Sequence, residues 1–346
     1  DGAVPAATAP VCPAAEDAGQ PRPLRVLLVN PPSPDGQIYI RDVNRSGRLS
    51  REGTIWPQTS LALIAAVLAE AGCEVKIEDC IAERTNYQTL YRTMETWQPT
   101  HLILESVSST IEKDMQVGEF AKTLGAIVIL ISPHGEALAE ETKQRFPALD
   151  HVMRYEKHEE PEYILRELVT GMKRESHETF ETLPPARQDL LPIHRYRLPL
   201  IGSRYTFVIS SRGCAFRCSY CRTTVAWQTH PRFRSPETII EEITRYRLKN
   251  IAFHADIFTL RKEQVYRICE LMPKRIRWVA NTRTDTIDLP LLKAMKRAGC
   301  WQLFVGAESG NDTVLEANRK QATVEQTRQA VRWIKEAGIR VHGYFM

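Results

Sequence analysis

Short apolar runs rich in β-branched residues alternate with amphipathic segments along most of the chain. In the first half, residues at helical spacing separate runs that predict strands over residues 25–29, 74–78, 101–105, 126–131 and 151–153. Strands that alternate with helices form parallel sheets covered by helices on both faces. The pattern therefore predicts an N-terminal α/β domain over residues 23–171, built on a doubly wound, Rossmann-like parallel sheet.

A second series of the same kind occupies the rest of the chain, with strands predicted over residues 205–210, 250–254, 277–282, 301–306 and 340–345. Ser235 and Pro236 form a typical helix start, and Gly299 and Gly338 lie where helices are expected to end. Serial βα units favour a closed or partly closed barrel over residues 205–346, with its site at the carboxyl ends of the strands. Because the chain stops directly after an apolar strand, we expect this barrel to be incomplete.

The segments outside these two series differ in composition. Residues 172–204 lose the periodicity and accumulate proline, which predicts an interdomain linker. Residues 1–22 are rich in alanine and proline and have no signal-peptide pattern, so they are predicted to form a disordered tail. The length of 346 residues predicts two domains with a core each. No apolar run approaches the ~20 residues that span a bilayer.

Charge and cysteine content narrow the possible functions. The formal net charge is only +4 and the basic residues are scattered, so we expect a small-molecule substrate and no nucleic-acid partner. Of 8 cysteines, three fall close together and the others lie far apart, which is not a disulfide framework. Clustered thiols indicate metal or redox chemistry in a reducing compartment, so a cytoplasmic protein without a transmembrane segment is expected.

The clustered cysteines are Cys214, Cys218 and Cys221, directly after the first predicted strand of the barrel. A cubane iron-sulfur cluster needs four ligands, so a CxxxCxxC motif leaves one iron open to a chelating small molecule. The alternative is a structural zinc site completed by His230, although such sites are more often built from paired CxxC elements. An anionic cluster and ligand are also favoured by five arginines in a span without acidic residues: Arg212, Arg217, Arg222, Arg232 and Arg234.

With a tyrosine before its last cysteine, this motif resembles the signature of the radical S-adenosylmethionine (SAM) superfamily. The resemblance implies a partial (β/α)6 barrel in which a [4Fe-4S] cluster binds SAM, and one electron cleaves the sulfonium to a 5′-deoxyadenosyl radical. The stretches FHADIFT, NTRTD and FVGAESG look like strand-end motifs of the same superfamily. By this resemblance, the expected SAM contacts are Tyr220, Asp256, Arg283, Glu308 and Ser309.

The N-terminal half resembles the cobalamin (B12)-binding domain of one radical SAM class, in the stretch VNPPSP and the register of its later strands. In that class, cobalamin lies between the sheet and the barrel. The strand ends supply the expected cobalamin contacts, which are Asn30, Ser106, Ser132 and His134. The chain has no DxHxxG, a motif that this class usually lacks as well. It departs from the class by reading ISPH for the usual Gly-Gly-Pro-His and YEKH for the usual Gly-Glu-Gly-Glu.

The resemblance implies a cobalamin-dependent methyltransferase that acts on an unactivated carbon of a small-molecule or tetrapyrrole-like substrate. An electron donor such as flavodoxin or ferredoxin would supply the electron. A radical SAM oxidase, cyclase or mutase of the same architecture, without methyl transfer, is the first alternative. A more distant alternative is a non-catalytic scaffold in which the cysteines hold zinc.

Overall fold

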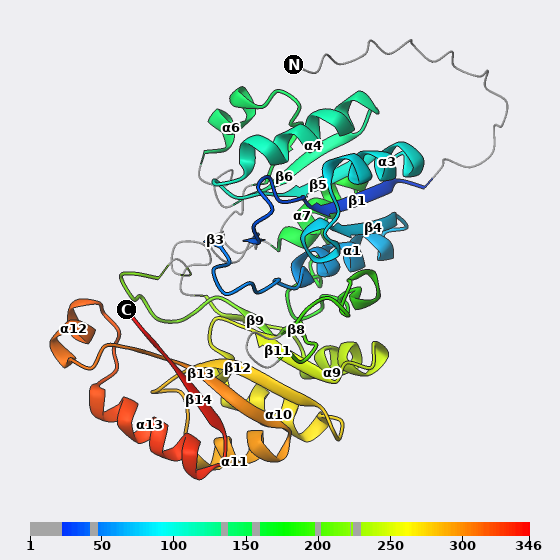
Figure 1. Ribbon diagram of the computed structural model, residues 1–346. Coiled ribbons are helices and arrows are strands. Elements are labelled where there is room, and N and C mark those ends of the chain that lie inside the picture. The colour runs from blue at the N-terminus through cyan, green and yellow to red at the C-terminus, as the bar shows by residue number, and fades with distance from the viewer. Residues whose placement is uncertain are drawn as a thin grey trace, which may run out of the picture.

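The computed structural model describes residues 23–41, 48–132, 138–153, 160–197, 202–221, 223 and 230–346. The predicted disordered tail over residues 1–22 lies outside these described residues. Figure 1 shows two α/β halves, with the N-terminal sheet above the C-terminal barrel and the segment that contains β3 between them. None of the helices in the described ranges has the length and apolar character needed to cross a membrane.

The N-terminal half contains a five-stranded parallel sheet, as predicted, in the order β4-β1-β5-β6-β7. Its strands are β1 (Arg25–Asn30), β4 (Glu74–Asp79), β5 (His101–Glu105), β6 (Ile127–Ile131) and β7 (His151–Val152). Every residue of β5 is buried, which is expected for a central strand with helices on both faces. The strand order changes direction between β1 and β5, and the crevice outside such a switch point is where ligands of this architecture bind.

Helices cover both faces of this sheet and confirm its doubly wound form. One face packs against α1 (Thr59–Glu70) and α7 (Pro161–Thr170). The opposite face packs against α3 (Tyr87–Trp97) and α4 (Ile111–Thr123). The remaining short elements of this half are β2 (Tyr39–Ile40), β3 (Arg48–Leu49), α2 (Cys80–Glu83) and α6 (Ala139–Arg145).

The C-terminal half contains a second five-stranded parallel sheet, in the order β14-β13-β12-β11-β8, which forms the partial barrel. Its strands are β8 (Thr206–Ile209), β11 (Asn250–His254), β12 (Arg277–Arg283), β13 (Cys300–Glu308) and β14 (Arg340–Phe345). The helices on its outside are α9 (Pro236–Arg245), α10 (Lys262–Leu271), α11 (Leu289–Arg297), α12 (Asp312–Ala317) and α13 (Val324–Glu336). Ser235 caps α9 by accepting a hydrogen bond from the Thr238 amide at 3.0 Å, as the sequence predicted.

Besides the cores expected for two domains, one hydrophobic cluster extends through both halves. Each half does have a cluster on its outer side, between the sheet and the helices that cover it. The third cluster joins Val26 and Leu28 of the N-terminal sheet, Leu63 of α1, and Phe207 and Val279 of the barrel. The predicted linker takes part in it, through its 3-10 turn η1 (Gln188–Leu190) and the buried side chains around that turn.

The barrel interior can be identified from the alternation of residues along β13. Leu303 and Val305 belong to the cluster under the outer helices, so Phe304, Gly306 and Glu308 face the other way. Phe304 pairs in register with Asn281 of β12 and His342 of β14. One layer of the interior is therefore polar and aromatic, directly below the strand ends.

Candidate functional site

The cysteine loop leaves the barrel through a short antiparallel ribbon, made of β9 (Ser211–Arg212) and β10 (Arg232–Phe233). Gly213 follows with a φ of +87°, and a Cβ atom on it would lie 2.7 Å from the carbonyl oxygen of His230. Only glycine fits this turn, because its backbone conformation and its close contact both exclude a side chain. The turn directs the chain from β9 into the cysteine motif.

The cysteines lie where the sequence predicted, at the carboxyl end of the barrel strands. Cys214 and Cys218 are buried and Cys221 is half-buried. The sulfur of Cys214 accepts a hydrogen bond from the Phe216 amide at 3.5 Å, and that of Cys218 accepts one from Arg283 at 3.6 Å. Burial raises the pKa of the Cys214 thiol to about 11. Metal binding must therefore supply the energy that holds this group as a thiolate.

The hydrogen-bond donors around the cysteine sulfurs suit the thiolate ligands of an iron-sulfur cluster. Across the described ranges, no three His, Cys, Asp or Glu side chains converge as they would around a single metal ion. Zinc and a cubane cluster both bind thiolates, and a cubane cluster takes each thiolate on a different iron. Amide and guanidinium donors to the sulfur atoms also suit thiolates that carry shared negative charge.

Asp256 and Arg283, predicted as SAM contacts, both hold the cysteine loop. The Asp256 carboxylate accepts hydrogen bonds from the Gly213 amide at 2.8 Å and from the Thr223 hydroxyl at 2.9 Å, so it joins the two sides of the loop. The Arg283 guanidinium lies 3.6 Å from the centre of the Phe216 ring and donates to the Cys218 sulfur. These contacts assign both residues a positioning role, and their contact with SAM stays a prediction.

Glu308 forms a buried ion pair that the sequence did not reveal. Its carboxylate accepts a hydrogen bond from Lys320 Nζ at 2.9 Å, at the strand end beside the cysteine loop. Glu308 has a φ of +64°, an uncommon conformation for a residue other than glycine and one associated with functional sites. Lys320 also accepts a hydrogen bond from Arg283 at its carbonyl, which links the pair to the loop.

The remaining predicted SAM contacts differ in their surroundings. Burial, with the nearby charges of Glu308 and Cys218, raises the pKa of Tyr220, so its phenol lies near both groups. Ser309 instead caps a local turn, because its hydroxyl accepts a hydrogen bond from the Asn311 amide at 3.2 Å. Tyr220 therefore lies within the site, whereas Ser309 borders it.

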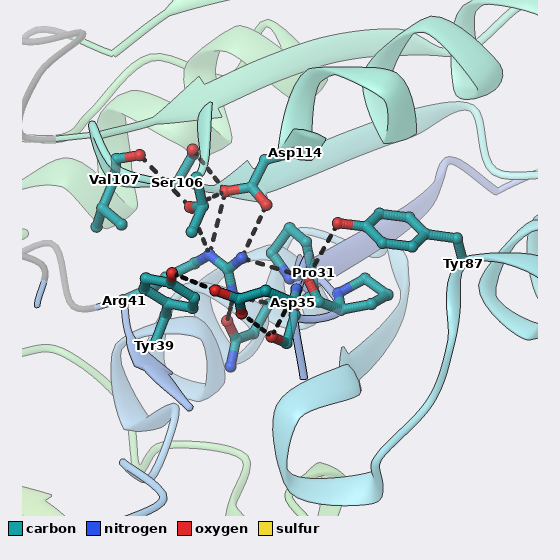
Figure 2. Close-up of polar contacts among 12 residues, drawn as sticks. Pro31, Asp35, Tyr39, Arg41, Tyr87, Ser106, Val107 and Asp114 are labelled. Carbon is teal, nitrogen blue, oxygen red and sulfur yellow. Dashed lines mark hydrogen bonds and ion pairs between the residues drawn. The ribbon is translucent and has the colours of Figure 1, made fainter. Parts of the chain in front are cut away.

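A buried polar network around Arg41, drawn in Figure 2, lies at the strand ends of the N-terminal sheet. Arg41 is fully buried and binds both carboxylate oxygens of Asp114, at 2.8 and 3.1 Å. The Ser106 hydroxyl donates to the same carboxylate at 2.7 Å, and the Asn30 amide oxygen accepts from Arg41 at 3.2 Å. Two of the predicted cobalamin contacts are therefore already tied to protein partners.

This network continues to the predicted linker. Asn30 donates to the Asp79 carboxylate at 2.8 Å, and the hydroxyl of Tyr196 donates to its other oxygen at 2.7 Å. Burial raises the pKa of Asp79 to about 6, although these hydrogen bonds oppose the shift. The carboxyl end of β4 is thus fixed to the segment that leads into the barrel.

Part of the expected cobalamin site falls outside the described residues, namely His134 and the YEKH stretch at 155–158. Ser132 is described and is fully buried at the end of β6. Ser50 and Thr54, between β3 and α1, have buried hydroxyls that find no hydrogen-bond partner among the described residues. Unpaired buried hydroxyls between the two halves fit a ligand with many amide groups, such as cobalamin.

Comparisons with known proteins agree with this geometry. Residues 208–346 match the family model of the radical SAM superfamily. An uncharacterized methyltransferase of Pyrococcus horikoshii is 27% identical over 356 residues, covering 93% of this chain and 74% of its own length. An anaerobic magnesium-protoporphyrin IX monomethyl ester cyclase of Cereibacter sphaeroides is 21% identical, covering 89% of this chain and 56% of its own length.

The fold is shared with a solved enzyme. The cobalamin-dependent SAM radical enzyme OxsB, solved with aqua-cobalamin and SAM bound, superposes with a TM-score of 0.69 and 17% sequence identity. The match covers 94% of this chain and 49% of the OxsB chain. The chain thus spans about half the length of this solved structure and of the cyclase.

Proposed function

We propose that the chain, whose residues 208–346 match the radical SAM family model, cleaves SAM reductively as a cobalamin-dependent methyltransferase. Cys214, Cys218 and Cys221 would hold the [4Fe-4S] cluster. When bound, the cluster supplies the electron that breaks a carbon–sulfur bond of SAM. The observation that carries the proposal is the position of these thiols, on a loop at the strand ends of a barrel, with hydrogen-bond donors on two of the sulfurs.

The Glu308–Lys320 pair is the best candidate for orienting SAM. A lysine ammonium can bind the SAM carboxylate, and a glutamate can accept from an ammonium group or a ribose hydroxyl. Both side chains are largely buried, so water competes little with such contacts. Tyr220 lies beside them and offers an aromatic surface to the adenine ring.

The barrel interior below this pair is the proposed substrate site. Phe304 is partly exposed and stacks on the exposed Tyr344 with 5.9 Å between ring centres. Such surfaces favour a planar or largely apolar substrate, and the layer of Asn281 and His342 adds groups that can fix its orientation. The cobalamin would lie between the two halves, near Asn30, Ser106 and Ser132.

Methylation is preferred over other radical chemistry because a relative that covers 93% of this chain is named a methyltransferase. The cyclase relative supports the second candidate, a reaction of the same architecture without methyl transfer. Product analysis separates the two. Methyl transfer releases S-adenosylhomocysteine in addition to 5′-deoxyadenosine, whereas the second candidate gives 5′-deoxyadenosine without methylated product.

The experiment is anaerobic reconstitution, with Cys218→Ala as the test variant and Cys269→Ala as the control, since Cys269 lies outside the motif. We expect about four irons per chain in wild type and in the control. Cys218→Ala should lose SAM cleavage and most of this iron while its N-terminal half stays folded. Retained 5′-deoxyadenosine formation in Cys218→Ala, or a colourless zinc protein, would contradict the proposal.

The proposal also covers the electron donor and the cellular compartment. The electron would come from a small redox protein such as flavodoxin or ferredoxin, because one electron is consumed in each cleavage. A thiolate-ligated cluster with an open iron is best kept in a reducing compartment, so we propose the cytoplasm. Cobalamin content after reconstitution tests the remaining cofactor, since the second candidate does not require it.

A further inference from the structure

Four charged side chains form a buried cluster between the two halves, away from the SAM contacts. Glu162 of α7 accepts two hydrogen bonds from Arg212 of β9, at 2.5 and 3.0 Å. Glu160, which precedes α7, pairs with Arg232 of β10 at 2.5 Å and lies 3.5 Å from Arg212. The start of one N-terminal helix thus holds both strands of the ribbon.

The cluster is shielded from water and balanced in charge. The side chains of Glu162, Glu160, Arg212 and Arg232 are 1, 2, 5 and 18% exposed. Both guanidinium groups also lie over the ring of Phe180, at 5.1 and 5.9 Å from its centre. Buried pairs of this kind are strongly destabilised when one partner is removed, because the other charge is left unpaired.

The two arginines connect the charged cluster to the cysteine loop. Arg212 lies two residues before Cys214, and Arg232 lies on the strand that returns from the cysteine loop. The loop therefore begins and ends at residues that are held by the N-terminal half. Within the barrel, Asp256 holds the loop from the other side, through the Gly213 amide.

We propose that Glu160 and Glu162 are positioning residues, which fix the cysteine loop through Arg212 and Arg232 and make its geometry depend on the docked N-terminal half. This inference rests on the proposed function, since the loop matters as the cluster site. The dependence has a physical basis, because a two-residue ribbon has too few backbone hydrogen bonds to hold a loop alone. The four-charge cluster provides the additional contacts that hold the ribbon and its loop.

Hydrogen exchange on the full chain, without iron or SAM, tests the inference. Glu162→Gln should speed exchange of the amides at 213–221 by at least about tenfold relative to wild type. The control is Glu178→Gln, because Glu178 pairs with Arg166 of the same helix and touches no part of the ribbon. It should leave loop exchange within about twofold of wild type, at a similar loss of overall stability.

If Glu162→Gln fails to fold, a second variant provides the test. Arg232→Lys retains the charge at the less buried position and loses only the planar guanidinium, so we expect intermediate loop exchange. Equal loop exchange in the ribbon variants and in the control would overturn the inference. The exchange measurement needs no SAM cleavage, so a failure of the proposed function would appear separately, as absent 5′-deoxyadenosine in wild type.

Discussion

At the scale of single residues, Asp79 is buried and accepts hydrogen bonds from Asn30 of the N-terminal sheet and from Tyr196 of the predicted linker. Burial raises its pKa from 3.8 to about 6, so the folded protein keeps this proton at a pH where the unfolded chain has lost it. Because the folded state binds more protons in this window, stability falls as pH rises from about 4 to about 6. The ionised Asp79 carboxylate therefore destabilises the folded protein at neutral pH.

Asp79→Asn removes this titration and keeps the side-chain oxygen that accepts hydrogen bonds. The unfolding free energy of the variant, relative to wild type, should rise by about 1.4 kcal/mol from about pH 5 to about pH 7.5. Urea unfolding at the two pH values measures it. A difference that does not change with pH would show that the Asp79 pKa is not raised.

A substitution at Gly306 tests whether the Glu308–Lys320 ion pair beside the cysteine loop contributes to SAM binding. A Cβ atom there would lie 2.5 Å from the Glu308 carboxylate and 3.0 Å from Lys320 Nζ, which are both ends of flexible side chains. Gly306→Ala should therefore cost under about 1 kcal/mol of stability, yet displace the pair and weaken SAM binding about tenfold. SAM dissociation constants of reconstituted protein measure this. Gly310→Ala is the control, because a Cβ atom on Gly310 meets nothing within 4 Å.

The sequence identified the cysteines because their spacing is local, but it could not assign the roles of their neighbours. Asp256 and Arg283 were predicted as SAM contacts, and the structure shows both holding the loop, through partners 43 and 65 residues away along the chain. Lys320 and Arg41 gave no signal at all. A lysine or arginine in a polar stretch indicates a site only when folding buries it beside a carboxylate.

At the scale of elements, strand prediction succeeded where apolar runs were long enough to have a period. The predicted strands at 250–254 and 340–345 have the bounds of β11 and β14. The two-residue strand β7 was predicted, but β2, β3, β9 and β10, which are equally short, were missed, because two residues carry no alternation and their pairing is set by distant contacts. Those missed elements include the ribbon that carries the cysteine loop.

Two helix-to-strand turns of the barrel allow the cost of a strained backbone to be compared with the added cost of a steric clash. Gly299 has a φ of +102°, and a Cβ atom there would lie 2.0 Å from the Ile276 carbonyl oxygen. Gly338 has a φ of +72°, but its nearest neighbour would be the Lys296 side chain at 3.6 Å. Gly299→Ala should cost at least about 3 kcal/mol and Gly338→Ala about 1 kcal/mol, since only the first adds a backbone clash. Urea unfolding distinguishes them, and equal costs would contradict this explanation.

At the scale of the whole molecule, the predicted division into two domains understates how strongly they are joined. Helix α1 is buried along residues 59–68, and the Thr59 hydroxyl donates to the Phe207 carbonyl of the barrel at 3.3 Å. The sequence showed α1 as one more helix of the first sheet. Its second contact surface was not visible, because a helix that is apolar on every side looks the same whether it is covered by one sheet or by two.

A shared core predicts that the two halves unfold together. Leu63 lies in the cluster that spans both halves, and Leu292 lies in the outer cluster of the barrel. Leu→Ala at either position should cost about 2–5 kcal/mol, because each side chain is fully buried. If unfolding is one transition, Leu63→Ala lowers the unfolding midpoint of β12 as much as that of β5, and Leu292→Ala does the same.

Hydrogen exchange as a function of denaturant, followed on peptides from β5 and β12, measures both midpoints in the same sample. The two variants control for each other, since each places the cavity in a different half. A β5 midpoint that stays at the wild-type value in Leu292→Ala would show that the halves unfold independently. The charged cluster at the ribbon would then be too weak to transmit stability between the two halves.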